Sequence, residues 1–149
     1  MATSRRIEEI SKPYHPLPAR AAELPYSPAV CVSGPVDMVF LSGMTAAPLY
    51  HSHPHVREEH LHAPDIETQA RRAMDKIKMI LEGQGITLRH IVKMTKYLTD
   101  MRDQEGVAAV MKEYLGEWKP ASTTICIHSL NQPGARIEID VIAIKDRQA

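Results

Sequence analysis

Residues 120–127 read PASTTICI and, after a turn-forming segment, residues 135–144 read ARIEIDVIAI. In the second stretch apolar residues alternate with the acidic residues Glu138 and Asp140. An alternation of period two predicts a β-strand with one buried side and one open side. Acidic residues on the open side form either an ordinary solvated surface or a functional one. These two stretches therefore predict the C-terminal strands of a sheet and a first candidate site.

The rest of the chain shows further strand and helix patterns. Two apolar runs flank a turn that contains Gly34 and Pro35, which predicts a β-hairpin. A helix is expected to begin after Asp65 as its N-cap and to end at Gly83 or Gly85, and a second helix is expected to end at Gly116. The expected strands are residues 29–32, 38–42, 91–98, 123–128 and 136–144, and the expected helices are residues 65–83 and 107–115.

The order ββαβαββ predicts an α+β fold in which one mixed sheet carries two helices on one face. The last two strands are expected to pair as a hairpin around residues 131–134. No helix is left to cover the other face of the sheet. We therefore expect that face to be buried by self-association with closed cyclic symmetry.

The N-terminal part has a different composition. Residues 11–28 contain five prolines, which remove backbone donors and fix the chain, so residues 1–28 are expected to form an extended arm without regular elements. Residues 29–149 are expected to form one domain, with a histidine-rich insertion at residues 50–62.

Composition narrows the classes of partner. Of the 149 residues 44% are apolar, and 18 basic residues balance 18 acidic ones. A neutral chain has no field that attracts nucleic acid or an anionic membrane, so neither is an expected partner. The apolar runs are too short for a membrane span or a signal core, and we expect a cytoplasmic protein. Cys31 and Cys126 lie in apolar runs and are expected to be buried thiols without a disulfide.

Six short motifs together resemble a known family. They are LPYS (24–27), VFLSG (39–43), TQAR (68–71), IVKMT (91–95), the 120–127 stretch, and IEI (137–139). In this order and at these spacings they resemble the RidA/YjgF family of enamine and imine deaminases, over residues 26–144. The resemblance implies a chorismate-mutase-like fold, no cofactor, and a homotrimer whose three active sites lie in the clefts between subunits.

The resemblance also implies roles for individual residues. Glu138 would hold the hydrolytic water or shuttle a proton, because one carboxyl group can serve both proton movements. In the family an arginine that follows the Pro120 position clamps the substrate carboxylate, but Ser122 stands there and lacks both the charge and the planar fork. α-Imino acids derived from serine or threonine are therefore not expected as substrates, and the chain is expected to belong to a divergent subgroup. The other implied substrate-binding residues are Tyr26, Ser42, Gly43 and Thr124.

Two further residues are candidates to replace the missing arginine. Arg136 lies two positions before Glu138, so both side chains are expected on one face of the strand. Arg136 either binds the substrate or forms a surface ion pair. His128 lies at the end of the preceding strand and either binds or protonates the substrate or is an ordinary strand-end histidine.

Five of the eight histidines lie within residues 51–62. In an extended chain His51, His53 and His55 would share a face and, with Glu58 or Glu59, could bind zinc or another transition metal. The spacing matches no standard metal motif. The alternatives are a solvated, pH-sensitive loop and a lid over the cleft. The deamination itself is expected to need no metal, because a carboxyl group activates the water.

The leading hypothesis is a trimeric deaminase that hydrolyses an enamine or imine to a carbonyl compound and ammonia, with Glu138 as acid and base. The altered Pro120 motif suggests a substrate other than a simple 2-aminoacrylate, and by analogy with the family an aminomuconate-type catabolic intermediate would suit an enlarged, rebuilt pocket. The alternative is a non-catalytic trimer of the same fold that binds a small molecule or acts as a chaperone. Ribonuclease activity is not expected for a neutral chain with few aromatic residues.

Overall fold

The computed structural model describes residues 4–147. Its strands are β1 (Ser11–Tyr14), β2 (Ala29–Val32), β3 (Val36–Phe40), β4 (Ile91–Leu98), β5 (Ala121–Cys126) and β6 (Ile137–Asp146). Its α-helices are α1 (Ile7–Ile10), α2 (Ile66–Gly83) and α3 (Gln104–Leu115). Four short 3-10 helices are η1 (Pro18–Glu23), η2 (Arg57–His60), η3 (Leu88–His90) and η4 (Met101–Asp103).

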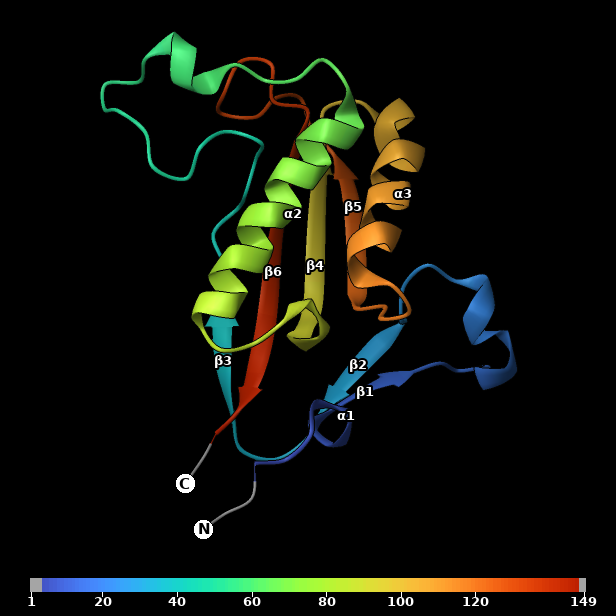
Figure 1. Cartoon of the computed structure of the whole chain (residues 1–149). Coiled ribbons are helices and arrows are strands. Elements are labelled where there is room, and N and C mark those ends of the chain that lie inside the picture. Colours follow the sequence, from blue (N-terminus) through green and yellow to red (C-terminus); the bar gives the residue numbers. More distant parts are fainter. Residues whose placement is uncertain (1–3, 148–149) are drawn as a thin grey trace.

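The main sheet has four strands in the order β3-β6-β4-β5. β4 and β5 are parallel, and the other pairs are antiparallel. Helices α2 and α3 pack against each other on one face of this sheet (Figure 1). A mixed sheet with two helices on one face confirms the predicted α+β fold.

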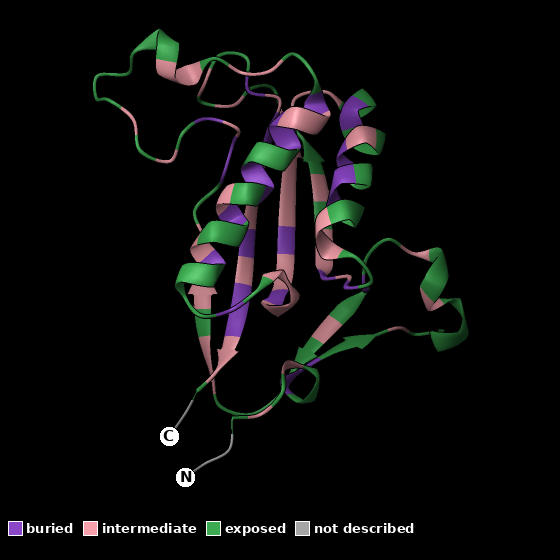
Figure 2. Cartoon of the chain, viewed as in Figure 1, coloured by how far each residue is buried: buried purple, intermediate pink, exposed green. Residues whose placement is uncertain are grey.

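Helix α2 follows its sequence pattern closely. The carboxylate of Asp65 accepts a hydrogen bond of 2.8 Å from the backbone nitrogen of Thr68, which confirms Asp65 as the N-cap. The stripe of α2 that faces the sheet is buried, as Figure 2 shows in purple. Each fully buried Ile, Leu or Met side chain contributes roughly 1.5–3 kcal/mol to stability. The buried apolar residues of α2 are Ile66, Ala70, Ala73, Met74, Ile77 and Leu81.

The alternation along β6 divides its side chains between the two faces of the sheet. Ile137, Ile139 and Val141 are buried beneath the helices, whereas Glu138 and Asp140 are only half-buried on the opposite face. We call this second face, which carries no helix, the open face. The alternation in the sequence therefore predicted correctly which side of β6 is covered.

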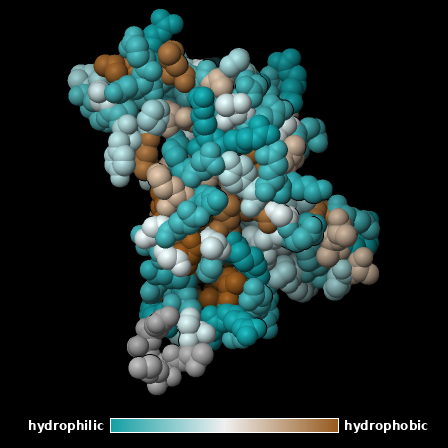
Figure 3. Space-filling view, in the orientation of Figure 1, coloured by the Kyte–Doolittle hydropathy of each residue, from teal (hydrophilic) through white to brown (hydrophobic). Residues whose placement is uncertain are grey.

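The open face exposes several large apolar side chains. Phe40 and Met38 on β3 are 69% and 54% exposed. Ile125 on β5 lies on the same face and is 40% exposed. By contrast, the face that carries α2 and α3 is mostly hydrophilic (Figure 3). The open face is therefore a candidate for burial by another copy of the chain.

The predicted hairpin of residues 29–42 is wrong. β2 pairs with β1 to form a separate two-stranded sheet, and β3 pairs with β6. The guanidinium of Arg5 donates hydrogen bonds of 2.9 Å to the carbonyls of Ser33 and Pro35, and Gly34 has a φ of +80°. These contacts fix a bend that sends the two strands to different sheets.

The N-terminal arm also contains regular structure, contrary to the prediction. β1 and η1 lie within it, and β1 includes Pro13. Proline is tolerated there because β1 pairs only with β2, so the other edge of β1 needs no backbone donor.

The predicted hairpin between the last two strands is wrong as well. β4 lies between β5 and β6 and pairs with both. The chain passes from β4 through α3 to the parallel strand β5, which is a crossover that a helix commonly makes. Residues 127–136 then carry the chain past β4 to β6.

Two smaller points concern exposure. Cys31 and Cys126 are both exposed, so the prediction that they are buried thiols is wrong. Cys31 lies on β2 in the separate two-stranded sheet, and Cys126 ends β5, the edge strand of the main sheet. Within residues 4–147, no helix combines the length and the apolar character that crossing a bilayer requires.

Candidate functional site

A cavity of about 780 Å³ lies between α3, the β4–β5 edge of the sheet and the segment that precedes β2. Its lining includes three residues that the sequence predicted for the substrate site, namely Tyr26, Ser122 and Thr124. Tyr26 is held there by its neighbour Ser27, whose hydroxyl donates to the carbonyl of Lys119. A second hollow of about 970 Å³ beside Trp118 contains none of the predicted residues.

Lys96 projects into this cavity beside Ser122. Its strand neighbours Met94 and Leu98 are buried under the helices, so Lys96 lies on the same side of β4. The ammonium of Lys96 donates a hydrogen bond of 2.9 Å to the hydroxyl of Ser122. Burial, and to a smaller extent the charge of Lys93, lower the pKa of Lys96. Lys96 forms no ion pair among the described residues, and its charge therefore lies beside Ser122.

Glu138 lies on the open face, next to an irregularity in the neighbouring strand segment. Leu41 pairs with Val141 and Met44 pairs with Ile139. The two residues Ser42 and Gly43 therefore lie opposite the single residue Asp140. This is the pattern of a β-bulge, which often occurs beside functional sites. The carboxyl group of Glu138 fills the space in front of Gly43, where a Cβ would lie only 1.8 Å from Oε1.

The surroundings of Glu138 favour its protonated form. Burial raises the pKa of Glu138, and the nearby carboxylate of Asp140 raises it further. Tyr97, which pairs with Glu138 across β4 and β6, donates a hydrogen bond of 3.0 Å to Asp140. A carboxyl group with a raised pKa keeps its proton to higher pH than an ordinary glutamate and can both give and take a proton, as acid–base catalysis requires.

The predicted site residues therefore fall into two groups on one chain. Glu138 and Gly43 meet on the open face, with Ser42 beside them in the bulge. Tyr26, Ser122 and Thr124 line the cavity, which is on the helix side of the sheet. The register of β4 and β5 places Ser122 and Thr124 in line with Met94 and Lys96, and thus on the face opposite to Glu138.

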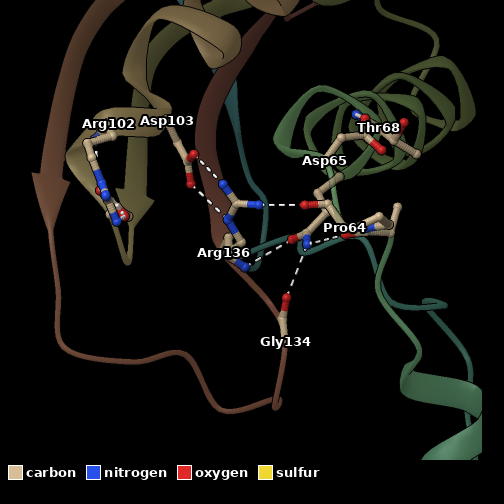
Figure 4. Close-up of polar contacts among 10 residues, drawn as sticks. Pro64, Asp65, Thr68, Arg102, Asp103, Gly134 and Arg136 are labelled. Atoms are coloured by element: carbon tan, nitrogen blue, oxygen red, sulfur yellow. Dashed lines mark hydrogen bonds and ion pairs between the residues drawn. The ribbon is translucent and has the colours of Figure 1, made fainter.

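Arg136 belongs to neither group. Its guanidinium pairs with the buried carboxylate of Asp103 and also donates to the carbonyl of Pro64 at 2.6 Å (Figure 4). The side chain of Gln69 joins the same network, since it accepts from the backbone nitrogen of Arg136 at 2.9 Å and donates to Gly134 at 3.1 Å. The ion pair that the sequence left as one alternative for Arg136 is thus present, and it ties the start of β6 to α2 and η4.

His128 and the histidine-rich segment also lie apart from the cavity. His128 is exposed just after β5 and does not line the cavity. The rings of His51, His53, His55 and His60 lie close together in the loop that precedes α2. None of these histidines lines the cavity of their own chain.

Lys96, Tyr97 and Asp140 were not among the residues chosen from the sequence. For Lys96 a signal was present, because a lysine on the apolar side of an alternating strand, between Met94 and Leu98, is unusual. Tyr97 and Asp140 carry no such signal, since a polar residue on the open side of a strand is common. Their contact depends on the register between β4 and β6.

Comparisons with known proteins agree with this fold and these motifs. A family model described as Endoribonuclease L-PSP matches residues 17–145. The RutC family protein PH0854 of Pyrococcus horikoshii is 40% identical over 82 residues, which are 55% of this chain and 64% of that protein. The match thus spans just under two thirds of that relative.

Two longer matches cover most of the chain. The 2-iminobutanoate/2-iminopropanoate deaminase of Dermatophagoides farinae is 29% identical over 135 residues, which are 91% of this chain and 94% of that protein. The crystal structure of YyfA from Yersinia pestis, a protein of unknown function in the conserved Rid family, has a TM-score of 0.61 at 30% identity. That match covers 80% of this chain and 86% of YyfA. The chain therefore belongs to the Endoribonuclease L-PSP family, the RidA/YjgF family that its motifs predicted.

Proposed function

We propose that this protein is a hydrolytic deaminase for enamines or imines that carry a carboxylate, with Glu138 as the acid and base. The observation that carries the proposal is the carboxyl group of Glu138, which has a raised pKa and is seated against Gly43 in the bulge. The similarity to a relative named as an iminobutanoate and iminopropanoate deaminase supports the same chemistry.

The reaction needs two proton movements that one carboxyl group can make. Protonated Glu138 gives its proton to the β-carbon of the enamine, which converts the C=C–N unit to an iminium ion. The resulting carboxylate then takes a proton from the water that attacks the iminium carbon. The carbinolamine so formed loses ammonia and leaves a carbonyl group. An imine substrate enters the same sequence once its nitrogen is protonated.

Lys96 is the proposed partner of the substrate carboxylate. The family's arginine would stand at Ser122, and the ammonium of Lys96 lies 2.9 Å from the Ser122 hydroxyl. An ammonium is a point charge with three donors and lacks the bidentate fork of arginine. Lys96 can therefore attract a carboxylate without fixing its plane, which relaxes the geometry that a small α-imino acid would need.

The size of the cavity favours a substrate longer than 2-aminoacrylate. About 780 Å³ lies within the range of roughly 300–1,000 Å³ that is typical of pockets for larger small molecules. The lining contains three lysines, Lys96, Lys112 and Lys119, and three glutamates, Glu23, Glu105 and Glu117. We take an aminomuconate-type dicarboxylate as the candidate substrate, with its second carboxylate beside Lys112 or Lys119.

The proposed site is completed by a second copy of the chain. Glu138 and Lys96 are on opposite faces of one sheet, so they do not reach a single small molecule within one chain. In a closed trimer the cavity edge of one subunit can meet the open face of the next. Such packing would also bury Met38, Phe40 and Ile125.

The test is ammonia release from a panel of freshly generated enamines and imines, which includes 2-aminoacrylate and an aminomuconate-type dicarboxylate. The wild-type protein is expected to accelerate hydrolysis of the dicarboxylate most, and Glu138→Gln is expected to lose that acceleration. If no member of the panel is hydrolysed faster than in buffer, or if Glu138→Gln is as fast as the wild type, the proposed function is wrong.

A further inference from the structure

The loop between the bulge and α2 brings together histidines that are up to nine positions apart in the sequence. The rings of His51, His53, His55 and His60 lie 4.7–5.0 Å apart, centre to centre, in five of their six pairs. Nitrogen atoms of His51, His55 and His60 all lie within 4.8 Å of one another. We call His51, His55 and His60 the histidine cluster.

We propose that the histidine cluster is a binding site for a divalent transition metal, with Zn²⁺ as the simplest occupant. This proposal is independent of the deaminase activity proposed above. Imidazole rings that bind one zinc ion at Zn–N distances of about 2.0–2.1 Å have ring centres about 5 Å apart in a tetrahedral arrangement. The observed separations match that spacing. Neutral nitrogen ligands also suit zinc and its neighbours in preference to calcium or magnesium.

His51 shows the contact that commonly orients a metal-binding histidine. Its Nδ1 lies 3.2 Å from the carbonyl oxygen of Pro48. Because a carbonyl oxygen only accepts, this contact places the proton on Nδ1 and leaves Nε2 with a free lone pair. A ring nitrogen that donates to a backbone carbonyl while the other binds the metal is a recurrent feature of zinc sites.

The ring of His60 has no hydrogen-bond partner. Both of its ring nitrogens are buried and unpartnered within the described part of the chain, and the ring nitrogens of His62, which lies outside the cluster, are in the same state. A buried polar atom without a partner is costly and calls for an explanation. A bound metal ion would satisfy one of the nitrogens of His60. His60 ends η2, which turns its ring back toward His51 and His55.

The charge around the cluster also suits a cation. Glu59 lies near His51 and His60, and its carboxylate is fixed by hydrogen bonds of 2.6 Å and 2.9 Å from the backbone nitrogen and hydroxyl of Ser52. Held in this way, Glu59 provides a negative charge beside the three rings without being one of the ligands. Its bonds to Ser52 also join the two ends of the histidine segment.

The position of the loop indicates a structural role for the metal. The loop projects from the side of α2 that is away from α3 (Figure 1). Most of residues 50–58 are exposed, so little apolar burial holds this part of the loop. A metal that joins residue 51 to residue 60 would close the loop across its base. We therefore infer that the ion fixes the loop and does not take part in the proposed reaction of Glu138.

Zn²⁺ binding to the full chain without an affinity tag tests the proposal. Titration against a chromophoric chelator at neutral pH is expected to give one Zn²⁺ per chain for the wild type. His60→Ala and His55→Ala are each expected to weaken binding more than tenfold. His62→Ala is the matched control, because His62 belongs to the same histidine-rich segment but lies outside the cluster. It is expected to change the affinity less than threefold.

Protease cleavage of the loop is a second measurement, which distinguishes a folded metal site from an unstructured histidine tract. Zn²⁺ is expected to slow cleavage of the loop by a protease in the wild type and in His62→Ala, but not in His60→Ala. Equal losses of affinity in His60→Ala and His62→Ala, or no loss in either, would overturn the proposal. Circular dichroism of each variant checks that the fold is unchanged, as the exposed position of the loop leads us to expect.

Discussion

The carboxyl group of Glu138 occupies the space that a side chain at position 43 would need. A Cβ at Gly43 would lie 1.8 Å from Oε1 of Glu138 and 2.7 Å from its carboxyl carbon. A side chain at position 43 would therefore force the carboxyl group of Glu138 to move, whereas the φ of Gly43 is not positive and sets no such restriction. The bulge and the acidic residue form one unit, in which the backbone of the bulge determines where the carboxyl group lies.

Gly43→Ala is expected to lower kcat of the proposed reaction by about 10²-fold, because the added methyl group displaces the carboxyl group and a misplacement of about 1 Å can cost that much. Gly83→Ala is the matched control, since a Cβ there meets no atom within 4 Å. The measurement is the rate of ammonia release at saturating substrate. Similar rates for Gly43→Ala and the wild type would contradict the placement of Glu138 at the reacting atoms.

Glu138→Gln is expected to lower the rate by about 10²- to 10⁴-fold and to leave the fold intact, because the amide keeps the shape and loses the proton. In the wild type the rate is expected to fall as pH rises through the raised pKa of Glu138, since the acid form is then lost. Asp140→Asn removes a negative charge that raises this pKa, so the fall should move to lower pH. A pH profile that Asp140→Asn leaves unchanged would contradict this assignment.

The same raised pKa has a consequence for stability. The folded state holds the proton of Glu138 more tightly than the unfolded chain does. The stabilising contribution is therefore complete below the ordinary glutamate pKa and is lost as pH rises through the raised value. Chemical denaturation at a series of pH values measures the free energy of unfolding. Over that pH interval this free energy should fall less in Glu138→Gln than in the wild type.

Lys96→Met is expected to raise KM for a carboxylate-bearing substrate at least tenfold with a smaller change in kcat, because it removes a charge that attracts the substrate. Lys93→Met is the matched control. Lys93 lies on the same strand and donates an equivalent bond to the hydroxyl of Thr123, but on the open face. Equal effects of the two substitutions on KM would show that Lys96 has no special role in binding.

Ser122→Arg is expected to increase affinity for small α-carboxylate enamines, because it restores a bidentate clamp at a position that lines the cavity. The ammonium of Lys96 would lie next to the new guanidinium and oppose it. The double variant Ser122→Arg with Lys96→Val should therefore bind such substrates more tightly than Ser122→Arg alone. Competition binding of a small α-keto acid measures the affinity of each variant. Tighter binding by Ser122→Arg alone than by the double variant would count against a shared subsite.

The chain is expected to be a trimer in solution, because its open face exposes Met38 and Phe40 and carries no helix. Light scattering at micromolar concentration should give three times the mass of one chain. Phe40→Glu should reduce that mass, since it would place a charge in the proposed interface. Met79→Glu, at another exposed apolar position but on α2, should not. A wild-type protein of monomer mass would exclude the assembly and the shared site that depends on it.

The sequence by itself determined the features that depend on neighbours a few positions away. The N-cap at Asp65, the strand from Ile91 to Leu98 and the two sides of β6 all follow from local periodicity and capping. Such patterns are read within one turn of helix or along one strand. The family motifs added the identity of the fold, because their order and spacing are also properties of the chain alone.

Only the tertiary structure decided which strands pair. Two hairpins that the turns suggested are absent, since β2 pairs with β1, and β4 separates β5 from β6. A turn sequence limits where the chain can bend, but the partner of a strand depends on which distant edge lies beside it. The same holds for Arg136, whose ion pair with Asp103 joins segments 33 positions apart.

The site shows the same division. The acidic side of β6 could be predicted, whereas the raised pKa of Glu138 depends on burial against the bulge and on Asp140. The place of Lys96 beside Ser122 follows from the register of two strands that are separated by a whole helix. The histidine tract was visible in the sequence, but only the folding of the loop brings His60 to His51 and His55. Contacts between distant segments are set by packing, and packing is a property of the whole molecule.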